Sequence, residues 1–92
     1  MNDQDSLLAQ YLGREVVLDA SSLFVYVGTL VGSDHRYYIL ENADVHDLRD
    51  TTTSRELYVV ESRRYGVRAN RARVLVRIDE VVSLSALDDV LL

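Results

Sequence analysis

A polar corner between two apolar stretches holds the residues best suited to chemistry. Within the segment 27–48, Ser33, Asp34 and His35 follow one another directly, and these are the residue types of a catalytic triad. A triad needs its members to converge in space, however, and neighbours in an extended chain point to opposite faces. We therefore interpret Asp34 as a turn residue whose carboxylate accepts backbone N–H groups in a tight corner.

Asp44, His46 and Asp47 offer metal-ligating atoms close together in the sequence. Residues 44 and 46 share one face of an extended strand, but two ligands do not hold a metal, which needs three or four. We interpret this group as a solvated strand end. The chain also has no cysteine, no nucleophile elbow and no phosphate-binding loop. The sequence therefore predicts a protein that is not an enzyme and needs neither cofactor nor small-molecule substrate.

Charge is distributed unevenly along the chain. Residues 63–77 (RRYGVRANRARVLVR) contain six arginines and no acid, whereas the other residues contain four arginines and fifteen acids. A strongly basic segment on a chain of net charge −5 suits phosphate groups, which supply most of the affinity of non-specific nucleic-acid binding. The alternative is that these arginines pair with acids of the same chain or of a neighbouring one, such as Glu41, Asp44, Asp47 and Asp50.

Length and composition limit the architecture. The chain has 92 residues, of which 48% are hydrophobic, and we expect one domain over residues 1–92. No apolar run reaches 18 residues, which argues against a membrane span. The N-terminus shows no basic segment followed by an apolar one, and cysteine is absent, so we expect the cytoplasm. Because a chain this short has a thin core, association with other chains is expected.

The hydrophobic pattern predicts a mainly β chain that begins with a short amphipathic helix. This helix spans residues 4–12, with Asp3 and Asp5 near its start and Gly13 at its end. The expected strands span residues 14–20, 23–34, 37–45, 72–77 and 80–85, with an insert at about 48–71 and a tail at about 86–92.

The strand at 23–34 is apolar on both faces. Val25 and Val27 point one way, and Tyr26 and Leu30 the other. A sheet with one wet face would alternate more cleanly, so we expect this sheet to be covered or curled. Gly28 and Gly32 fit a strongly bent sheet, because glycine inside a strand often marks a bend or a close backbone approach.

Residues 54–65 carry conflicting signals. The stretch LYVV alone is typical of a strand. Thr53 with Glu56 three residues later, however, forms a capping-box pattern, and Gly66 suits a left-handed C-terminal cap. We expect an extra helix here, inside the insert.

Two groups of residues resemble the two sequence motifs of the Sm-like (LSm) family. The first motif has a Gly, then x-Leu, then an Asp six residues after the Gly, then an apolar run ending in Leu; it is matched by Gly28, Leu30, Asp34, Ile39 and Leu40. The second has an apolar triplet followed by Arg-Gly-Asp-x-Val; it is matched by Val74, Leu75, Val76, Arg77, Asp79 and Val81, with Ile78 in place of the Gly. The resemblance covers residues 5–46 and 72–84.

The resemblance implies an Sm-like fold, in which an N-terminal helix precedes a bent five-stranded antiparallel sheet that closes into a small barrel. It also implies a homo-oligomeric ring of six or seven subunits joined edge to edge. The residues support association independently. The last two expected strands are short and rich in apolar residues, and such edges must be paired or covered.

The resemblance further implies binding of single-stranded RNA, in a chaperone or scaffold role. The family's nucleotide pocket corresponds to Asp34, Arg36, Tyr38, Arg77, Ile78 and Asp79, where Tyr38 stands in place of an Asn. Arg36 and Tyr38 offer planar groups on which a base could stack. Further phosphate contacts are expected from Arg68, Arg71 and Arg73. The alternative is a structural or protein-interaction oligomer of the same fold, in which Tyr38 and Ile78 fill the pocket.

Overall fold

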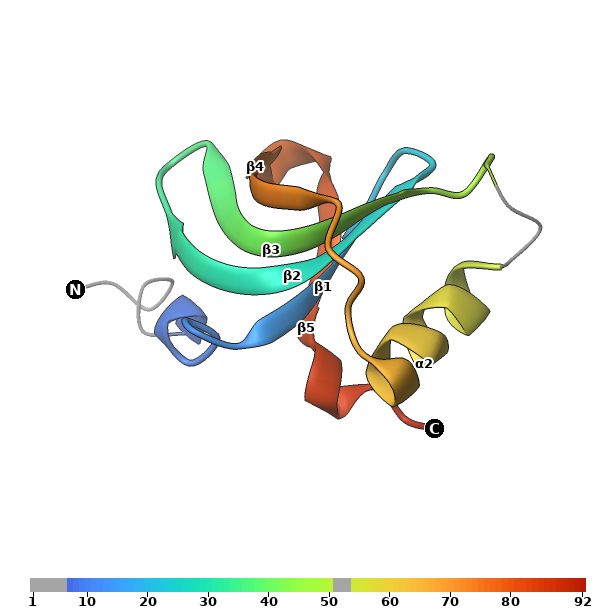
Figure 1. Ribbon diagram of the computed structural model, residues 1–92. Helices are drawn as coiled ribbons and strands as arrows, with labels where there is room; N and C mark the ends of the chain where they lie inside the picture. Colours follow the sequence, from blue (N-terminus) through green and yellow to red (C-terminus); the bar gives the residue numbers. More distant parts are fainter. Residues whose placement is uncertain (1–6, 51–53) are drawn as a thin grey trace.

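Five strands form one antiparallel sheet in the computed structural model of the chain, which describes residues 7–50 and 54–92. The order across the sheet is β4-β3-β2-β1-β5 (Figure 1). The strands are β1 (Glu15–Ala20), β2 (Phe24–Ser33), β3 (Tyr37–Asp47), β4 (Arg71–Arg77) and β5 (Val81–Ala86). Helix α2 (Arg55–Tyr65) lies between β3 and β4, and the 3-10 helices η1 (Ile78–Glu80) and η2 (Leu87–Asp89) follow β4 and β5. The predicted fold class and the extra helix are confirmed.

The N-terminal helix is described at residues 7–9, whereas residues 4–6 of the predicted helix, with Asp3 and Asp5, lie outside the described residues. Leu8 and Tyr11 pack against the core of the barrel. The turn after the helix reaches Gly13, whose φ of 80° is positive and whose N–H donates to the carbonyl of Leu30 at 2.7 Å. This contact joins the helix to β2.

The paired strands β2 and β3 bend sharply together (Figure 1). The register between these strands shifts at Gly28 and again near Gly32. A Cβ atom added to Gly28 would lie 2.8 Å from the Cβ of Ala43 and 2.9 Å from its Cα, so glycine allows the two backbones to approach closely. At Gly32 the same atom would meet only the Cδ1 of Ile39, at 3.7 Å. The close approach predicted from glycine therefore lies at Gly28.

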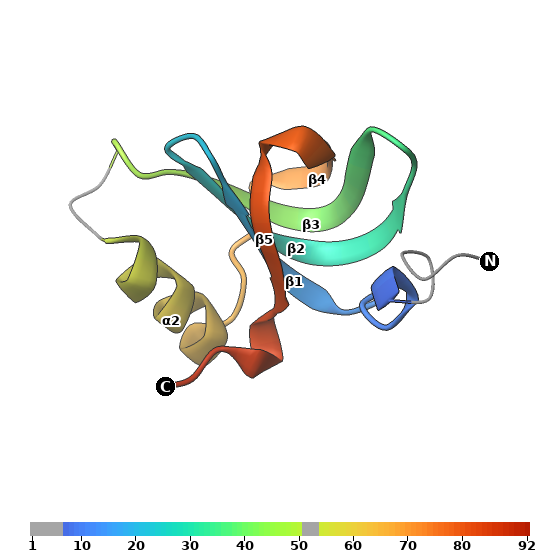
Figure 2. The same cartoon turned by 180° about the vertical axis from the view of Figure 1, so that it is seen from behind.

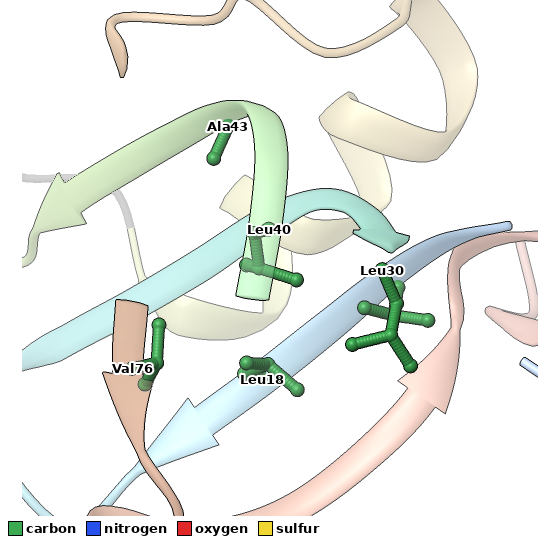
Figure 3. Close-up of a cluster of buried hydrophobic side chains, with 6 residues drawn as sticks. Leu18, Leu30, Leu40, Ala43 and Val76 are labelled. Carbon is green, nitrogen blue, oxygen red and sulfur yellow. The ribbon is translucent and has the colours of Figure 1, made fainter. Parts of the chain in front are cut away.

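One hydrophobic cluster fills the inside of the curled sheet (Figure 3). Its buried members come from β1, β2, β3 and β4: Val16, Leu18, Leu30, Leu40, Ala43 and Val76. Tyr26, Tyr38 and Leu84 are partly buried against it. The apolar residues on the inner face of these strands thus form the barrel interior.

A second cluster lies on the other side of the sheet, beneath α2. Val17 of β1 and Val25 and Val27 of β2 are buried there with Tyr58 of α2 and Leu87 of η2. Figure 2 shows α2 and the C-terminal segment on the same side of the sheet, outside its curl. The sheet is therefore both curled and covered, which explains why β2 is apolar on both faces.

The N-cap of helix α2 lies one residue after Thr53, the cap that the capping-box pattern predicted. Ser54 is the N-cap, and its side chain accepts a hydrogen bond from the N–H of Leu57 at 3.2 Å. The expected cap, Thr53, lies outside the described residues. At the other end Gly66 is the C-cap and donates its N–H to the carbonyl of Ser62. Its φ of 94° is positive, as predicted, but its ψ of 164° lies outside the left-handed helical conformation.

Tyr58 attaches α2 to β3. Its hydroxyl donates to Asp44 Oδ2 at 2.6 Å, and its ring stacks on His46 with centroids 3.9 Å apart. Burial, followed by the hydrogen bond to Asp44, raises the pKa of Tyr58, so the hydroxyl stays a donor. Asn70 also donates to Asp44, at 3.1 Å. Asp44 and His46, which the sequence suggested as a solvated strand end, instead hold the inserted helix in place.

Candidate nucleic-acid interface

The corner between β2 and β3 is built around the carboxylate of Asp34. Its Oδ1 accepts the backbone N–H of Arg36 at 2.8 Å and that of Tyr37 at 2.7 Å. These two hydrogen bonds hold the pKa of Asp34 below its usual range, because they stabilise the charged form. The predicted role of Asp34 as a turn-stabilising carboxylate is confirmed, and the bonds fix the backbone that carries Arg36.

A second corner, where β4 runs into η1, is joined to the first. The N–H of Ile78 donates to the carbonyl of Arg36 at 2.8 Å, and Tyr37 lies opposite Arg77 in the β3–β4 pairing. Arg77 also donates to Asp79 Oδ2 at 2.8 Å. Residues about 40 positions apart in the sequence are thereby held side by side.

A hollow of about 620 Å³ opens between the two corners. It is lined by His35, Arg36, Tyr37, Arg77, Ile78 and Asp79. Guanidinium groups bind phosphate as charged hydrogen-bond donors, and aromatic rings and guanidinium planes stack on bases. The hollow therefore offers the groups that a nucleotide of single-stranded nucleic acid needs.

The predicted pocket residues divide between two hollows. Arg36, Arg77, Ile78 and Asp79 line the one just described. Asp34 and Tyr38 line a second hollow of about 390 Å³ with residues of the N-terminal helix, and Ile78 contributes to both. Tyr38 packs against the barrel core, because its side chain lies on the inner face of β3.

Tyr37 and His35 line the hollow between the two corners but were not among the residues that the sequence predicted for the pocket. Both line the hollow with Arg77, and Tyr37 is half-buried. The signal was available in the alternation of strand side chains, because the inward position of Leu40 assigns residue 38 to the core face and residue 37 to the other.

Among the residues that the structure describes, most arginines of the segment 63–77 form no salt bridge with an acid. Within the described part of the chain the salt bridges join Arg49 to Asp47, Arg55 to Asp19 and Arg77 to Asp79. Among the acids considered as partners, Asp44 binds Tyr58 and Asn70, and Asp47 binds Arg49. Pairing of Arg63, Arg64, Arg68, Arg71 and Arg73 with acids of the same chain is thus wrong for residues 7–50 and 54–92.

The expected phosphate contacts lie in two places. Arg71 and Arg73 belong to β4, whereas Arg68 lines a smaller hollow of about 190 Å³ beside α2, with Asp44, Tyr58, Glu61 and Tyr65 among its neighbours. Over residues 7–50 and 54–92, side chains of histidine, aspartate and glutamate form no group of three that would suit a metal ion.

No helix in the described ranges is long and apolar enough to cross a membrane.

A short N-terminal helix, five strongly bent antiparallel strands and two corners joined at one end of the sheet define the Sm-like fold. The Sm protein of Pyrococcus abyssii, solved in complex with a uridine heptamer, is similar with a TM-score of 0.61 and 18% identity, over 94% of this chain and 99% of that one. The SmAP (LSm) protein of Methanococcus vannielii is similar with a TM-score of 0.57 and 20% identity, over 92% and 99%. No protein-family model and no curated protein sequence matches the chain. These likenesses establish the fold that the two motifs predicted.

Proposed function

We propose that the chain binds single-stranded RNA in the hollow between the two corners, without catalysis, as a chaperone or scaffold subunit. The observation that carries this proposal is the hydrogen bond from Ile78 to the Arg36 carbonyl. This bond holds the corners together, so that Arg36, Arg77 and Tyr37 line one open hollow. The uridine heptamer in the similar Pyrococcus structure supports the choice of ligand.

The residues of the hollow have distinct roles in this proposal. Arg36 and Arg77 contact phosphates, and Tyr37 and His35 provide surfaces for stacking a base. The ion pair between Arg77 and Asp79 is exposed, with side chains 61% and 66% accessible, and such a pair contributes little to stability. A phosphate can therefore replace Asp79 as the partner of Arg77 at low cost.

We infer weak discrimination among bases. Tyr38, which stands where the family has an Asn, packs against the barrel core and offers no amide to read a base edge. Stacking accepts any base, because every base has a π face. The expected ligand is single-stranded RNA with at most a modest preference for uridine.

We also propose that the chain, as one domain in the cytoplasm, assembles into a ring. β4 and β5 end the sheet, so each subunit has two different free edges. Val82 on β5 is 73% exposed. Pairing β4 of one copy with β5 of the next is a head-to-tail contact, which generates a closed ring when the rotation closes. The family resemblance suggests six or seven subunits.

Fluorescence anisotropy tests the RNA proposal. Labelled oligouridine and oligoadenosine of equal length are titrated with the protein at about 50 and about 200 mM salt, a range over which phosphate-dependent binding weakens strongly. We expect Arg77→Gln to weaken binding of both RNAs about tenfold at the lower salt concentration. The matched control is Arg64→Gln, because Arg64 is an exposed arginine on α2 without a salt bridge in the described ranges.

Two outcomes contradict the proposal. Absence of binding at about 50 mM salt excludes an RNA-binding role, because electrostatic attraction is strongest there. An equal loss in Arg64→Gln shows that overall charge is responsible and not the hollow. Light scattering on the same samples measures the assembly separately. A ring without RNA affinity points to the alternative of a structural or protein-interaction oligomer.

A further inference from the structure

Arginines occupy most of the outward face of β4. Side chains alternate along a strand, and Val74 and Val76 pack into the barrel interior. Residues 71, 73, 75 and 77 therefore point outward, and all four are exposed. We call Arg71, Arg73, Leu75 and Arg77 the β4 strip.

The guanidinium groups of the strip are available to a ligand. Arg73 lies opposite Glu41 on β3, but the two form no salt bridge. Among the described residues, the guanidinium of Arg71, with its five donors, makes one hydrogen bond, to the carbonyl of Asn70 at 3.0 Å. The described acids thus neutralise only Arg77, through the exposed pair with Asp79.

The strip continues the hollow at the β4–η1 corner. Arg77 belongs to both, and the next outward position, Leu75, lies opposite Ile39 on β3. Successive outward residues of a strand are about 6.6 to 6.8 Å apart. The phosphates of an extended single strand repeat at a similar distance, so one strand can contact alternate residues of β4 in turn. The apolar pair between the arginines offers a surface for a base.

We propose that the β4 strip is a second RNA-contact region, which guides a single strand from the hollow along β4 toward Arg71. The inference rests on the proposed function, because the strand is first held at the hollow. Charge favours such a polyanion, since the strip gathers positive charge on a chain of net charge −5. Pairing of the β4 edge within a ring would use backbone groups, and the outward side chains would remain accessible.

A length series tests the strip. Oligouridines of three and nine nucleotides are titrated with the wild-type chain, with Arg71→Gln/Arg73→Gln, and with the control Arg14→Gln/Arg64→Gln, which removes the same charge from two exposed residues outside β4. The strip variant should keep its affinity for the trimer within twofold and lose about tenfold for the nonamer. Its salt slope for the nonamer should fall by about 1.4, since each phosphate contact on a single strand contributes about 0.7. The control should change neither affinity by more than twofold.

Other results overturn the strip. If Arg77→Gln weakens nonamer binding but Arg71→Gln/Arg73→Gln does not, the hollow alone binds RNA and the strip has no role. If the control variant loses as much nonamer affinity as the strip variant, the overall charge of the chain and not the strip determines RNA affinity. If the wild-type chain binds neither RNA, the proposed function fails together with the strip. Binding of polyglutamate as tightly as the nonamer would identify an acidic peptide, and not RNA, as the class of ligand.

A conservative variant guards against misfolding. Arg71→Lys/Arg73→Lys keeps both charges, and we expect it to retain nonamer affinity within threefold. The circular dichroism spectrum of the lysine variant shows whether it is folded. If a folded lysine variant loses as much nonamer affinity as the glutamine variant, attraction between phosphates and the charges on β4 does not explain the loss, and the proposed role of the strip is rejected.

Discussion

Replacement of Gly28 by alanine tests the packing that bends the barrel. The added methyl would lie 2.8 Å from the Cβ of Ala43, 2.9 Å from its Cα and 3.2 Å from the carbonyl oxygen of Glu41. Two of these atoms are backbone, so no side-chain rotation relieves the contact and β2 must move away from β3. Overpacking of this kind costs about 1 to 3 kcal/mol, and we expect the upper half of that range. The matched substitution, Gly32→Ala, meets only the Cδ1 of Ile39 at 3.7 Å.

Urea unfolding at a fixed protein concentration measures the difference, because oligomer stability depends on concentration. With a slope of about 1.5 kcal/mol per molar, a loss of about 2 to 3 kcal/mol moves the midpoint of Gly28→Ala down by roughly 1.3 to 2 M. Gly32→Ala should shift its midpoint slightly upward or not at all, since alanine restricts the unfolded chain. Equal shifts in the two variants would refute the close approach of β2 and β3 as the reason for glycine at position 28.

Two further predictions concern α2 and the β3 terminus. Tyr58→Phe removes the hydroxyl that donates to Asp44, and it should lower the free energy of unfolding by about 1.5 to 3 kcal/mol. The control Tyr65→Phe, at a residue that is 72% exposed, should change this free energy little. Similar losses of the two variants in thermal unfolding would contradict the role of Tyr58. The side chain of Arg49 holds the pKa of Asp47 at about 2 in the folded chain, below its ordinary 3.8. Stabilisation from this carboxylate is therefore complete above about pH 4 and is lost as the pH falls toward 2. Asp47→Asn should show a flatter dependence of Tm on pH than the wild-type chain in that window. Identical slopes of Tm against pH in the two proteins would exclude this stabilisation by Asp47.

The sequence predicted the elements well because each one carried its own local signal. Short runs of apolar and β-branched residues indicated the strands, and Gly66 indicated the end of α2. The sequence alone left the start of α2 open, because serine and threonine are both good N-caps; the hydrogen bond that Leu57 donates identifies Ser54 as the N-cap. Local sequence signals were therefore sufficient to predict which helices and strands are present, but less so to predict the residues at which they begin and end.

The candidate site was harder to predict because it depends on register. The sequence placed Arg36 and Arg77 in one pocket through family resemblance, and both line the hollow. It selected Tyr38 where the hollow contains Tyr37, because carrying over a motif position ignores which face of β3 each residue takes. A shift of one residue moves a side chain to the opposite face of a sheet.

The attachment of α2 also had no local signal. From the sequence, Asp44 and His46 were interpreted as a solvated strand end. In the structure, Tyr58 of the inserted helix donates to Asp44 and stacks on His46. Helix α2 contributes Tyr58 to the cluster outside the barrel, so its packing depends on contacts between residues more than ten positions apart. Such contacts follow from the tertiary fold and not from a sequence pattern.

Photocrosslinking tests the central claim most directly. The purified chain is bound to an oligouridine that carries 4-thiouridine, irradiated, digested and analysed by mass spectrometry. We predict crosslinks to residues 35–37 and 77–79, which line the hollow, and their loss in Arg77→Gln. Crosslinks confined to α2, or unchanged in Arg77→Gln, would contradict RNA binding at the joined corners.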